Sequence, residues 1–225
     1  MNSKIQIGYW GIQGIAEPLR WLASYVGLDV EYVTETDTWF TEGRNNSLGF
    51  DFPNLPYLID GDYKLTESSA IPVYLALKAG RQDLLGATVQ EQATLRMLEG
   101  IFSDLRSGWQ QTIFCENNHA ESVSKFLCKE KGDGCYALHK LSAFLGKKEF
   151  FLGHITIFDF AFAYFLPFIL VVAKSLNCAF DTKDLQNLVA HSERISQLPK
   201  VKEIVQARAQ VPRIPPGMLK FELKP

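Results

Sequence analysis

Residues Asn54–Ser69 read NLPYLIDGDYKLTESS, and this stretch predicts how the first part of the chain folds. Pro56–Ile59 and Tyr63–Leu65 are rich in aliphatic and aromatic residues and are separated by Asp-Gly-Asp, a pattern typical of two strands in a hairpin. The acidic residue and two serines that end the stretch precede an apolar helical pattern running to about Lys78. We therefore expect a serine to cap that helix.

Upstream of this stretch, the sequence predicts two more strands with a helix between them. Lys4–Tyr9 alternates polar and apolar residues, and Val30–Thr34 is a second short run of strand-forming residues. Over Ala16–Val26 apolar residues recur at helical spacing, with Pro18 in the tolerated first turn and Gly27 at the end. A polar loop from about residue 35 to residue 50 completes a small α/β domain.

Downstream of Gly80-Arg81 the sequence changes character. No strand pattern is convincing from Thr88 to about Gln210, whereas helical periodicity recurs, for example over residues 95–105. The expected fold class is therefore α/β plus all-α. We expect an N-terminal α/β domain over residues 1–82 and an all-helical domain over residues 88–214.

The segment Ile155–Ala173 carries a single charge, Asp159, and is long enough to be considered as a membrane span. Thr156 and Asp159 fit a capping box at a helix start, and Pro167 interrupts the middle. No basic flank organises the ends. We therefore expect a buried helix of a soluble protein and no association with a membrane.

Composition excludes several classes of function. Hydrophobic residues make up 47%, charged residues 21%, and the formal net charge is -2, so the chain has no basic footprint for nucleic acid. The four histidines are scattered and indicate no metal site. The first residues lack the apolar run of a secretory signal, which favours the cytoplasm. The cysteines lack the spacing of a redox or zinc motif and are expected as reduced thiols: Cys115, Cys128, Cys135 and Cys178.

Three features of the predicted α/β domain suggest a ligand site. Tyr9 and Trp10 end a strand at the edge where open α/β sheets bind ligands, although an aromatic pair there also suits simple packing. Leu55 is suited to offer its backbone N–H and C=O to an extended peptide, or Pro56 merely starts an edge strand. Glu67-Ser68 offers a seat for a carboxylate at a helix start, or forms an ordinary cap.

Taken together, these features indicate a short peptide ligand with a carboxylate, an extended backbone and a reactive group near Tyr9. They stand in runs that resemble the mu-like cytosolic glutathione transferases: GYWGIQG at 8–14, GFDFPNLPYLIDG at 49–61, LTESSAI at 65–71, and FLG with TIFDF within 151–160. The likeness covers the whole chain in matching order and spacing. It implies an N-terminal thioredoxin-like, glutathione-binding domain followed by a C-terminal helical-bundle domain that holds the electrophile pocket.

The resemblance implies that Tyr9 is the catalytic residue and donates a hydrogen bond to the sulfur of glutathione. A bond to the charged form lowers the pKa of a thiol from about 8.5, and a shift of roughly two units corresponds to about 2.7 kcal/mol. The resulting thiolate is the nucleophile that attacks an electrophilic carbon. Glutathione serves as co-substrate, and no further cofactor is implied.

The same resemblance assigns further residues to glutathione binding: Trp10, Trp39, Arg44, Asn54, Leu55, Pro56, Glu67, Ser68 and Asp104. The two tryptophans and the arginine are expected at the glycyl end, Leu55 beside a cis proline at the cysteinyl backbone, and Glu67 with its neighbouring serine at the γ-glutamyl group. Asp104 is expected to reach the ligand of the neighbouring subunit. Phe52 aligns with an aromatic residue that inserts into the partner subunit, so a homodimer is implied.

The chain departs from the mu pattern in ways that concern the second substrate. The loop between the second strand and Asp51 is shorter, so the lid over the electrophile site is largely missing. For the same reason, the sequence places the basic glutathione-contacting residue only to within one or two positions of Arg44. Glu67 replaces a glutamine. Phe114 stands where a tyrosine hydroxyl assists the electrophile, and with Ile15 it is expected to line an apolar electrophile pocket.

The sequence therefore predicts a dimeric, cytoplasmic detoxification enzyme that conjugates glutathione to hydrophobic electrophiles. A glutathione-dependent isomerase remains an alternative, because it would use the same thiolate. A non-catalytic ligand-binding or structural protein of the same fold is a second alternative, against which the retained Tyr9 argues. A thiol–disulfide oxidoreductase is disfavoured because no cysteine precedes residue 115.

Overall fold

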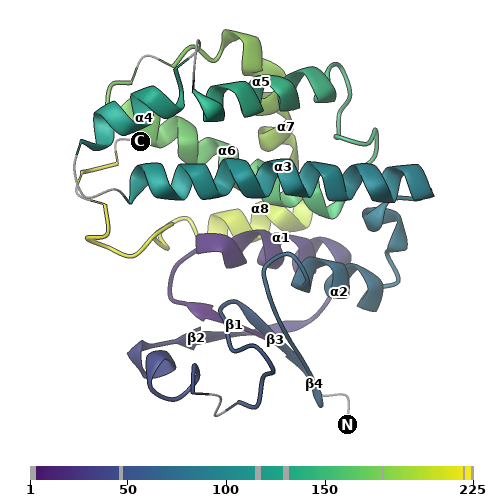
Figure 1. Cartoon of the computed structure of the whole chain (residues 1–225). Coiled ribbons are helices and arrows are strands. Elements are labelled where there is room, and N and C mark those ends of the chain that lie inside the picture. The colour runs from purple at the N-terminus through teal and green to yellow at the C-terminus, as the bar shows by residue number, and fades with distance from the viewer. Residues whose placement is uncertain are drawn as a thin grey trace. The chain divides into compact units, whose positions relative to one another are not determined.

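The structure, a computed structural model, describes residues 4–45, 48–114, 118–128, 132–178, 180–219 and 221–223 (Figure 1). The chain divides into two compact units. The first comprises residues 1–82 and 197–215, and the second comprises residues 83–196 and 216–225. The first unit thus includes a C-terminal segment that the division predicted from sequence assigns to the helical domain.

A four-stranded sheet with the order β2-β1-β3-β4 organises the first unit. Its strands are β1 (Ile5–Trp10), β2 (Val30–Glu35), β3 (Tyr57–Asp60) and β4 (Tyr63–Thr66). β1 and β2 run parallel, whereas β3 is antiparallel to both β1 and β4. All four predicted strands are present, and each ends one residue later than predicted.

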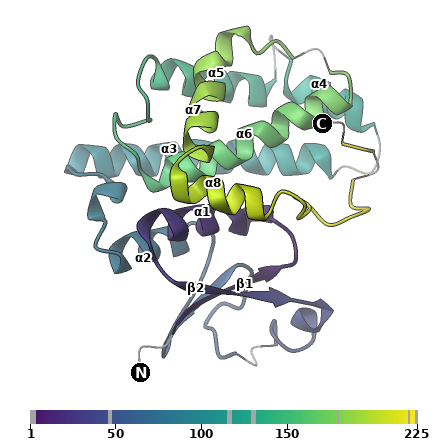
Figure 2. The same ribbon diagram turned by 180° about the vertical axis from the view of Figure 1, so that it is seen from behind.

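Helices α1 (Glu17–Val26) and α2 (Ile71–Lys78) lie on one side of this sheet (Figures 1 and 2). α1 packs against α2 and against α8 (Pro199–Ala207), which comes from the C-terminal segment. α1 has Pro18 in its first turn and ends at Gly27, whose φ of 77° is left-handed, as the sequence predicts. The thioredoxin-like character predicted for this unit is confirmed.

The predicted serine cap of α2 is wrong. The N-cap residue is Ala70, and no side chain caps the helix. The chain instead turns at Glu67, a non-glycine residue with a φ of 77°. The carbonyl oxygen of Glu67 accepts hydrogen bonds from the N–H groups of Ala70 at 3.0 Å and Ile71 at 3.1 Å, so the backbone itself satisfies donors that a serine would otherwise take.

The second unit is helical, as predicted. Its helices are α3 (Val89–Ile113), α4 (His119–Phe126), α5 (Asp133–Leu145), α6 (Ile157–Ser175) and α7 (Gln186–Ser196). α3 begins with a capping box, in which the N–H of Glu91 donates to Thr88 Oγ1 at 3.1 Å and the N–H of Thr88 donates to Glu91 Oε2 at 3.3 Å. α6 packs against α7, α3 and α4 and forms the core of the unit.

α6 is a buried core helix rather than an exposed apolar one. Its length and mean hydropathy would allow it to cross a membrane, but 72% of its most apolar stretch is buried inside the protein. Asp159 anchors its start by accepting hydrogen bonds from the N–H and the Oγ1 of Thr156, both at 2.7 Å, and from the N–H of Phe151 at 3.1 Å. Nε2 of His191 in α7 lies 2.8 Å from the same carboxylate, and both side chains are fully buried.

Candidate active site

A cleft of about 730 Å³ lies in the first unit. Its walls come from the end of β1, the short 3-10 turn Asp37–Phe40, the loop before β3 and the turn after β4. The residues that line it are Tyr9, Trp10, Trp39, Phe40, Arg44, Asp51, Phe52, Pro53, Asn54, Leu55 and Glu67. Among the described residues that the sequence assigns to glutathione, those outside this lining are Pro56, Ser68 and Asp104.

Tyr9 lies near the end of β1, paired with Thr34 of β2, and is 8% exposed. Its ring packs in an apolar cluster with Ile12 and Ala16. Gly14 passes so close to it that an added Cβ would lie 2.5 Å from Cε1 and 2.7 Å from the hydroxyl oxygen of Tyr9. Gly14 also has a φ of +49°, so its conformation and the lack of space both favour glycine there.

Trp39 forms the buried wall of the cleft, and Tyr57, which lies outside the lining, packs against it. Trp39 is 4% exposed and stacks on Tyr57 with ring centroids 5.8 Å apart. The Tyr57 hydroxyl donates a 2.6 Å hydrogen bond to Glu35 at the end of β2. Burial raises the pKa of Tyr57, and the bond to Glu35 raises it further, so this phenol stays protonated and keeps its bond.

The outer wall of the cleft is also aromatic. Trp10 packs beside Phe40 with ring centroids 5.4 Å apart, and Phe40 is 57% exposed. The N–H of Arg44 donates to the carbonyl oxygen of Trp39 at 2.7 Å, and this bond holds the loop after the 3-10 turn against the turn itself. Phe40 was not predicted as a lining residue, because it lies in a segment whose sequence predicts an irregular loop.

Asn54 links the two segments that are expected to hold a peptide. Its Nδ2 donates to Glu67 Oε1 at 3.0 Å, and its Oδ1 accepts the N–H of Leu55 at 2.9 Å. The Leu55–Pro56 peptide bond is cis, as the resemblance implies. Since the Leu55 N–H already donates to Asn54, an extended ligand would have to displace Asn54 before it could accept a hydrogen bond from Leu55.

The remaining predicted residues lie elsewhere. Ile15 packs at the edge of the Tyr9 cluster in the first unit. Asp104 in α3 and Phe114 just after α3 belong to the second unit and are exposed. An electrophile pocket shared by Ile15 and Phe114 therefore stays a prediction.

The described cysteines and histidines form no second reactive site. Cys115 lies outside the described residues, whereas Cys128, Cys135 and Cys178 are not in disulfides. Cys135 Sγ lies 3.4 Å from Nδ1 of His139, but the same nitrogen lies 2.9 Å from the carbonyl oxygen of Cys135. A carbonyl only accepts, so this nitrogen carries the hydrogen and does not serve as a base for the thiol. Within the described ranges, no three His, Cys, Asp or Glu side chains are grouped to hold a metal.

The sequence profile of the glutathione S-transferase N-terminal domain matches residues 5–77, and that of the C-terminal domain matches residues 134–195. A class-mu 26 kDa glutathione S-transferase of Fasciola hepatica, isozyme 51, is 34% identical over 207 residues, which cover 90% of this chain and 88% of that protein. The chain belongs to the glutathione S-transferase family.

Two further members of the glutathione S-transferase family resemble the chain over nearly its whole length. A glutathione S-transferase of Tyrophagus putrescentiae is 33% identical, over 95% of this chain and 94% of that protein. The crystal structure of the glutathione S-transferase Blo t 8 is 27% identical with a TM-score of 0.78, over 96% of this chain and 99% of that one. The match to the N-terminal domain of the family spans every residue of the cleft, whereas Asp104 and Phe114 lie between the two matched regions.

Proposed function

We propose that the chain is an enzyme that conjugates the thiolate of glutathione to hydrophobic electrophiles. The observation that carries this proposal is the cleft of the first unit, which Tyr9, Leu55 and Glu67 line together. Glutathione is a tripeptide with an ammonium group at one end and a thiol in its middle. The acidic residue suits the ammonium group, the backbone segment suits the peptide backbone, and the phenol suits the thiol.

Tyr9 is the proposed activator of the thiol. Its hydroxyl donates a hydrogen bond to the glutathione sulfur and thereby stabilises the thiolate over the thiol. The thiolate attacks the electrophilic carbon, a C–S bond forms, and the leaving group departs with its electron pair. Because the phenol is packed against Ile12, Ala16 and Gly14, little reorganisation is needed as charge develops on the sulfur.

The peptide-binding residues divide along the cleft in this proposal. Glu67, held by Asn54, faces the γ-glutamyl ammonium with Ser68 beside it, and the Leu55 backbone pairs with the cysteinyl residue beside the cis Pro56. Trp10, Trp39 and Arg44 receive the glycyl end. Glutathione is the co-substrate, and we propose that no other cofactor takes part.

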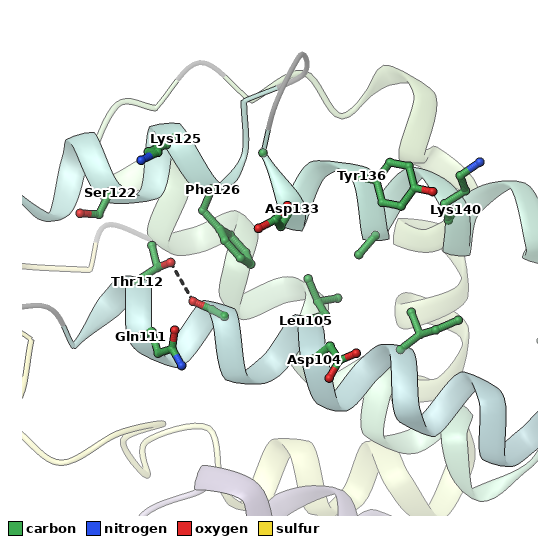
Figure 3. Close-up of a pocket in the computed structure, with 14 residues that line it drawn as sticks. Asp104, Leu105, Gln111, Thr112, Ser122, Lys125, Phe126, Asp133, Tyr136 and Lys140 are labelled. Carbon is green, nitrogen blue, oxygen red and sulfur yellow. Dashed lines mark hydrogen bonds between the residues drawn. The ribbon is translucent and has the colours of Figure 1, made fainter.

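We further propose a homodimer in which Phe52 of each copy docks into its partner. Phe52 is 79% exposed, so its ring is available to a partner. The second unit has a pocket of about 890 Å³ between α3, α4 and α5, shown in Figure 3. Asp104 lines this same pocket, which supports its assignment to the ligand of the neighbouring subunit.

The proposed docking pocket is suited to an aromatic ring. Phe126 lies against two glycines, since a Cβ added at Gly108 or Gly134 would come within 2.9 Å or 2.1 Å of its ring. Leu105 and the exposed Tyr136 extend the apolar lining around it. A second copy of the chain therefore has both a protruding ring and a pocket to receive one.

The relatives named as transferases favour conjugation over the two alternatives, isomerisation and ligand storage. An apolar electrophile pocket formed by Ile15 and Phe114, and a cytoplasmic location, remain part of this proposal. The loop that is shorter than in the mu pattern concerns the electrophile, not the activation of the thiol.

The proposal is tested by conjugation of glutathione to a chloronitrobenzene in wild type and in Tyr9→Phe. We expect turnover in wild type and a loss of roughly 25-fold at pH 7 in the variant, because a rise of the thiol pKa from about 6.5 to about 8.5 lowers the thiolate fraction from about 76% to about 3%. Tight glutathione binding without turnover in wild type would overturn the enzyme in favour of a binding protein. An isomerase is recognised because it returns glutathione, so free thiol is not consumed.

A further inference from the structure

A C-terminal segment of the first unit is fastened to the loop that follows Tyr9. The N–H of Gln13 donates to the carbonyl oxygen of Pro212 at 2.8 Å, and the N–H of Gly14 donates to that of Arg213 at 3.0 Å. Two consecutive backbone N–H groups of the loop are thus satisfied by residues almost 200 positions later in the chain. Both partners belong to the first unit.

The Gln13 side chain adds a second connection. Its Nε2 donates to the carbonyl oxygens of Arg208 at 3.0 Å and Val211 at 2.9 Å. Arg208 is the C-cap residue of α8, where carbonyl groups lack partners within the helix, so Gln13 supplies a missing donor. A third connection is ionic: Nε of Arg208 lies 2.9 Å and 3.2 Å from the two carboxylate oxygens of Glu17, whose side chain is 2% exposed.

Gly14 lies between this segment and the phenol of Tyr9. On one side its N–H is held by Arg213, and on the other its missing Cβ leaves the space that the Tyr9 hydroxyl occupies. A shift of the loop at Gly14 therefore changes the packing that fixes the phenol. The residues Arg208–Arg213 do not line the cleft, and the hydrogen bonds of Pro212 and Arg213 described above run to Gln13 and Gly14, so the proposed effect on chemistry passes through these two residues.

We propose that the segment Arg208–Arg213, fastened by Gln13, positions the Tyr9 hydroxyl for the sulfur of glutathione. This inference rests on the proposed role of Tyr9 as hydrogen-bond donor. Hydrogen bonds weaken steeply with poor distance and angle, so a loosened loop yields a weaker donor without removing any group from the peptide site. Gln13 is accordingly a positioning residue, and its loss should alter thiol activation more than glutathione affinity.

The test compares Gln13→Met with Gln92→Met in the full-length protein. Methionine keeps the length of the side chain but removes the amide that binds Arg208 and Val211. Gln92→Met is the matched control, because it removes a single 3.2 Å bond from a glutamine side chain to the carbonyl oxygen of Gly86 in the second unit. The measurements are kcat, KM for glutathione, and the thiol pKa of bound glutathione from its thiolate absorbance.

For Gln13→Met we expect the thiol pKa to rise by about half a unit to one unit, so kcat/KM measured about one pH unit below the wild-type thiol pKa should fall about 3- to 10-fold. KM for glutathione should stay within about twofold, and Gln92→Met should match wild type. Gln13→Asn keeps the amide one methylene shorter and should be intermediate, which preserves the test if Gln13→Met does not fold.

A double mutant separates this inference from the role of Tyr9. In the Tyr9→Phe background, Gln13→Met should cause no further loss, because both changes remove the same hydrogen bond. Additive losses, or an unchanged thiol pKa in Gln13→Met, overturn the positioning role. If Tyr9→Phe alone keeps full activity, the proposed function of Tyr9 fails instead.

Discussion

The ring of Tyr57 crosses β1 at Gly8, so closely that a Cβ added to Gly8 would lie 2.0 Å from Cζ of Tyr57. The hydroxyl of that ring is bound to Glu35, and its face carries Trp39. Gly8 therefore accommodates the ring that packs against Trp39 in the wall of the cleft, and Gly8 immediately precedes the proposed thiol activator in the chain. The two motifs GYW and NLPYL are thus in contact through Gly8 and the ring of Tyr57.

Gly8→Ala should destabilise the protein, because the new methyl group overlaps a ring that is fixed by Glu35 and Trp39. We expect a loss of about 2–3 kcal/mol in the free energy of unfolding, measured by urea denaturation. Gly100→Ala is the matched control: its added Cβ meets nothing within 4 Å, and alanine in a helix should stabilise by roughly 0.5–1 kcal/mol. Equal effects of the two changes would contradict the close crossing.

Phe52→Ala should weaken the proposed dimer. Removal of an aromatic side chain that fills a partner's pocket is expected to raise the dissociation constant about 30-fold or more, measured by sedimentation equilibrium. Phe40→Ala serves as control, since it removes another exposed phenylalanine from the first unit that is not part of the proposed docking. A dimer equally stable in both variants would rule out docking by Phe52.

Asp60 should make stability depend on pH in the acid range. Its carboxylate lies 2.6 Å from Nζ of Lys78 and accepts a 2.6 Å hydrogen bond from Tyr74, and the bonds to both groups lower the pKa of Asp60 below its ordinary 3.8. A lowered pKa stabilises the folded state at pH values above 3.8, and the contribution is lost as the pH falls through the lowered value.

Asp60→Asn should therefore cost about 0.5–1 kcal/mol at pH 7, a modest value because Lys78 is partly exposed to solvent. The difference from wild type should shrink as the pH is lowered in urea denaturation series. Asp62→Asn changes an exposed carboxylate two residues away and should leave the pH profile unaltered. A difference that persists undiminished at low pH would show that the ion pair is not its cause.

Asp159→Ala should be strongly destabilising. The change leaves His191 and the N–H groups of Phe151 and Thr156 without the fully buried carboxylate that satisfies them. We expect a loss of about 3–5 kcal/mol, measured as the free energy of unfolding. Asp181→Ala, whose side chain is 61% exposed, should cost less than about 1 kcal/mol, and a similar cost for both would refute the buried anchor.

The sequence allowed the fold and most of the cleft to be predicted, because both depend on local patterns. Alternation predicted β1, Pro18 and Gly27 marked the ends of α1, and Thr156 with Asp159 marked the start of α6. The residues of the cleft lie in short runs at strand ends. Those runs also carry the family resemblance that assigns roles to them.

Other features depend on conformation or on distant contacts and have no local signature. The left-handed Glu67 replaces the predicted serine cap of α2, and a non-glycine residue gives no warning of that turn. The sequence likewise does not indicate the hydrogen bond from the Leu55 N–H to Asn54, because it predicts that this N–H is available to a peptide ligand. The contact between Gln13 and Val211 joins parts of the chain that no periodicity relates.

The first unit is assembled from two stretches of chain, and this has a consequence for synthesis. The ribosome releases the four strands early, but α8 emerges only after the 114 residues from 83 to 196. At roughly 5–20 residues per second, this interval lasts roughly 6–23 s. During that time a nascent chain carries every residue of the cleft, while α1 lacks its packing partner α8. Premature termination would therefore yield a glutathione cleft without the segment Arg208–Arg213 that binds the loop after Tyr9.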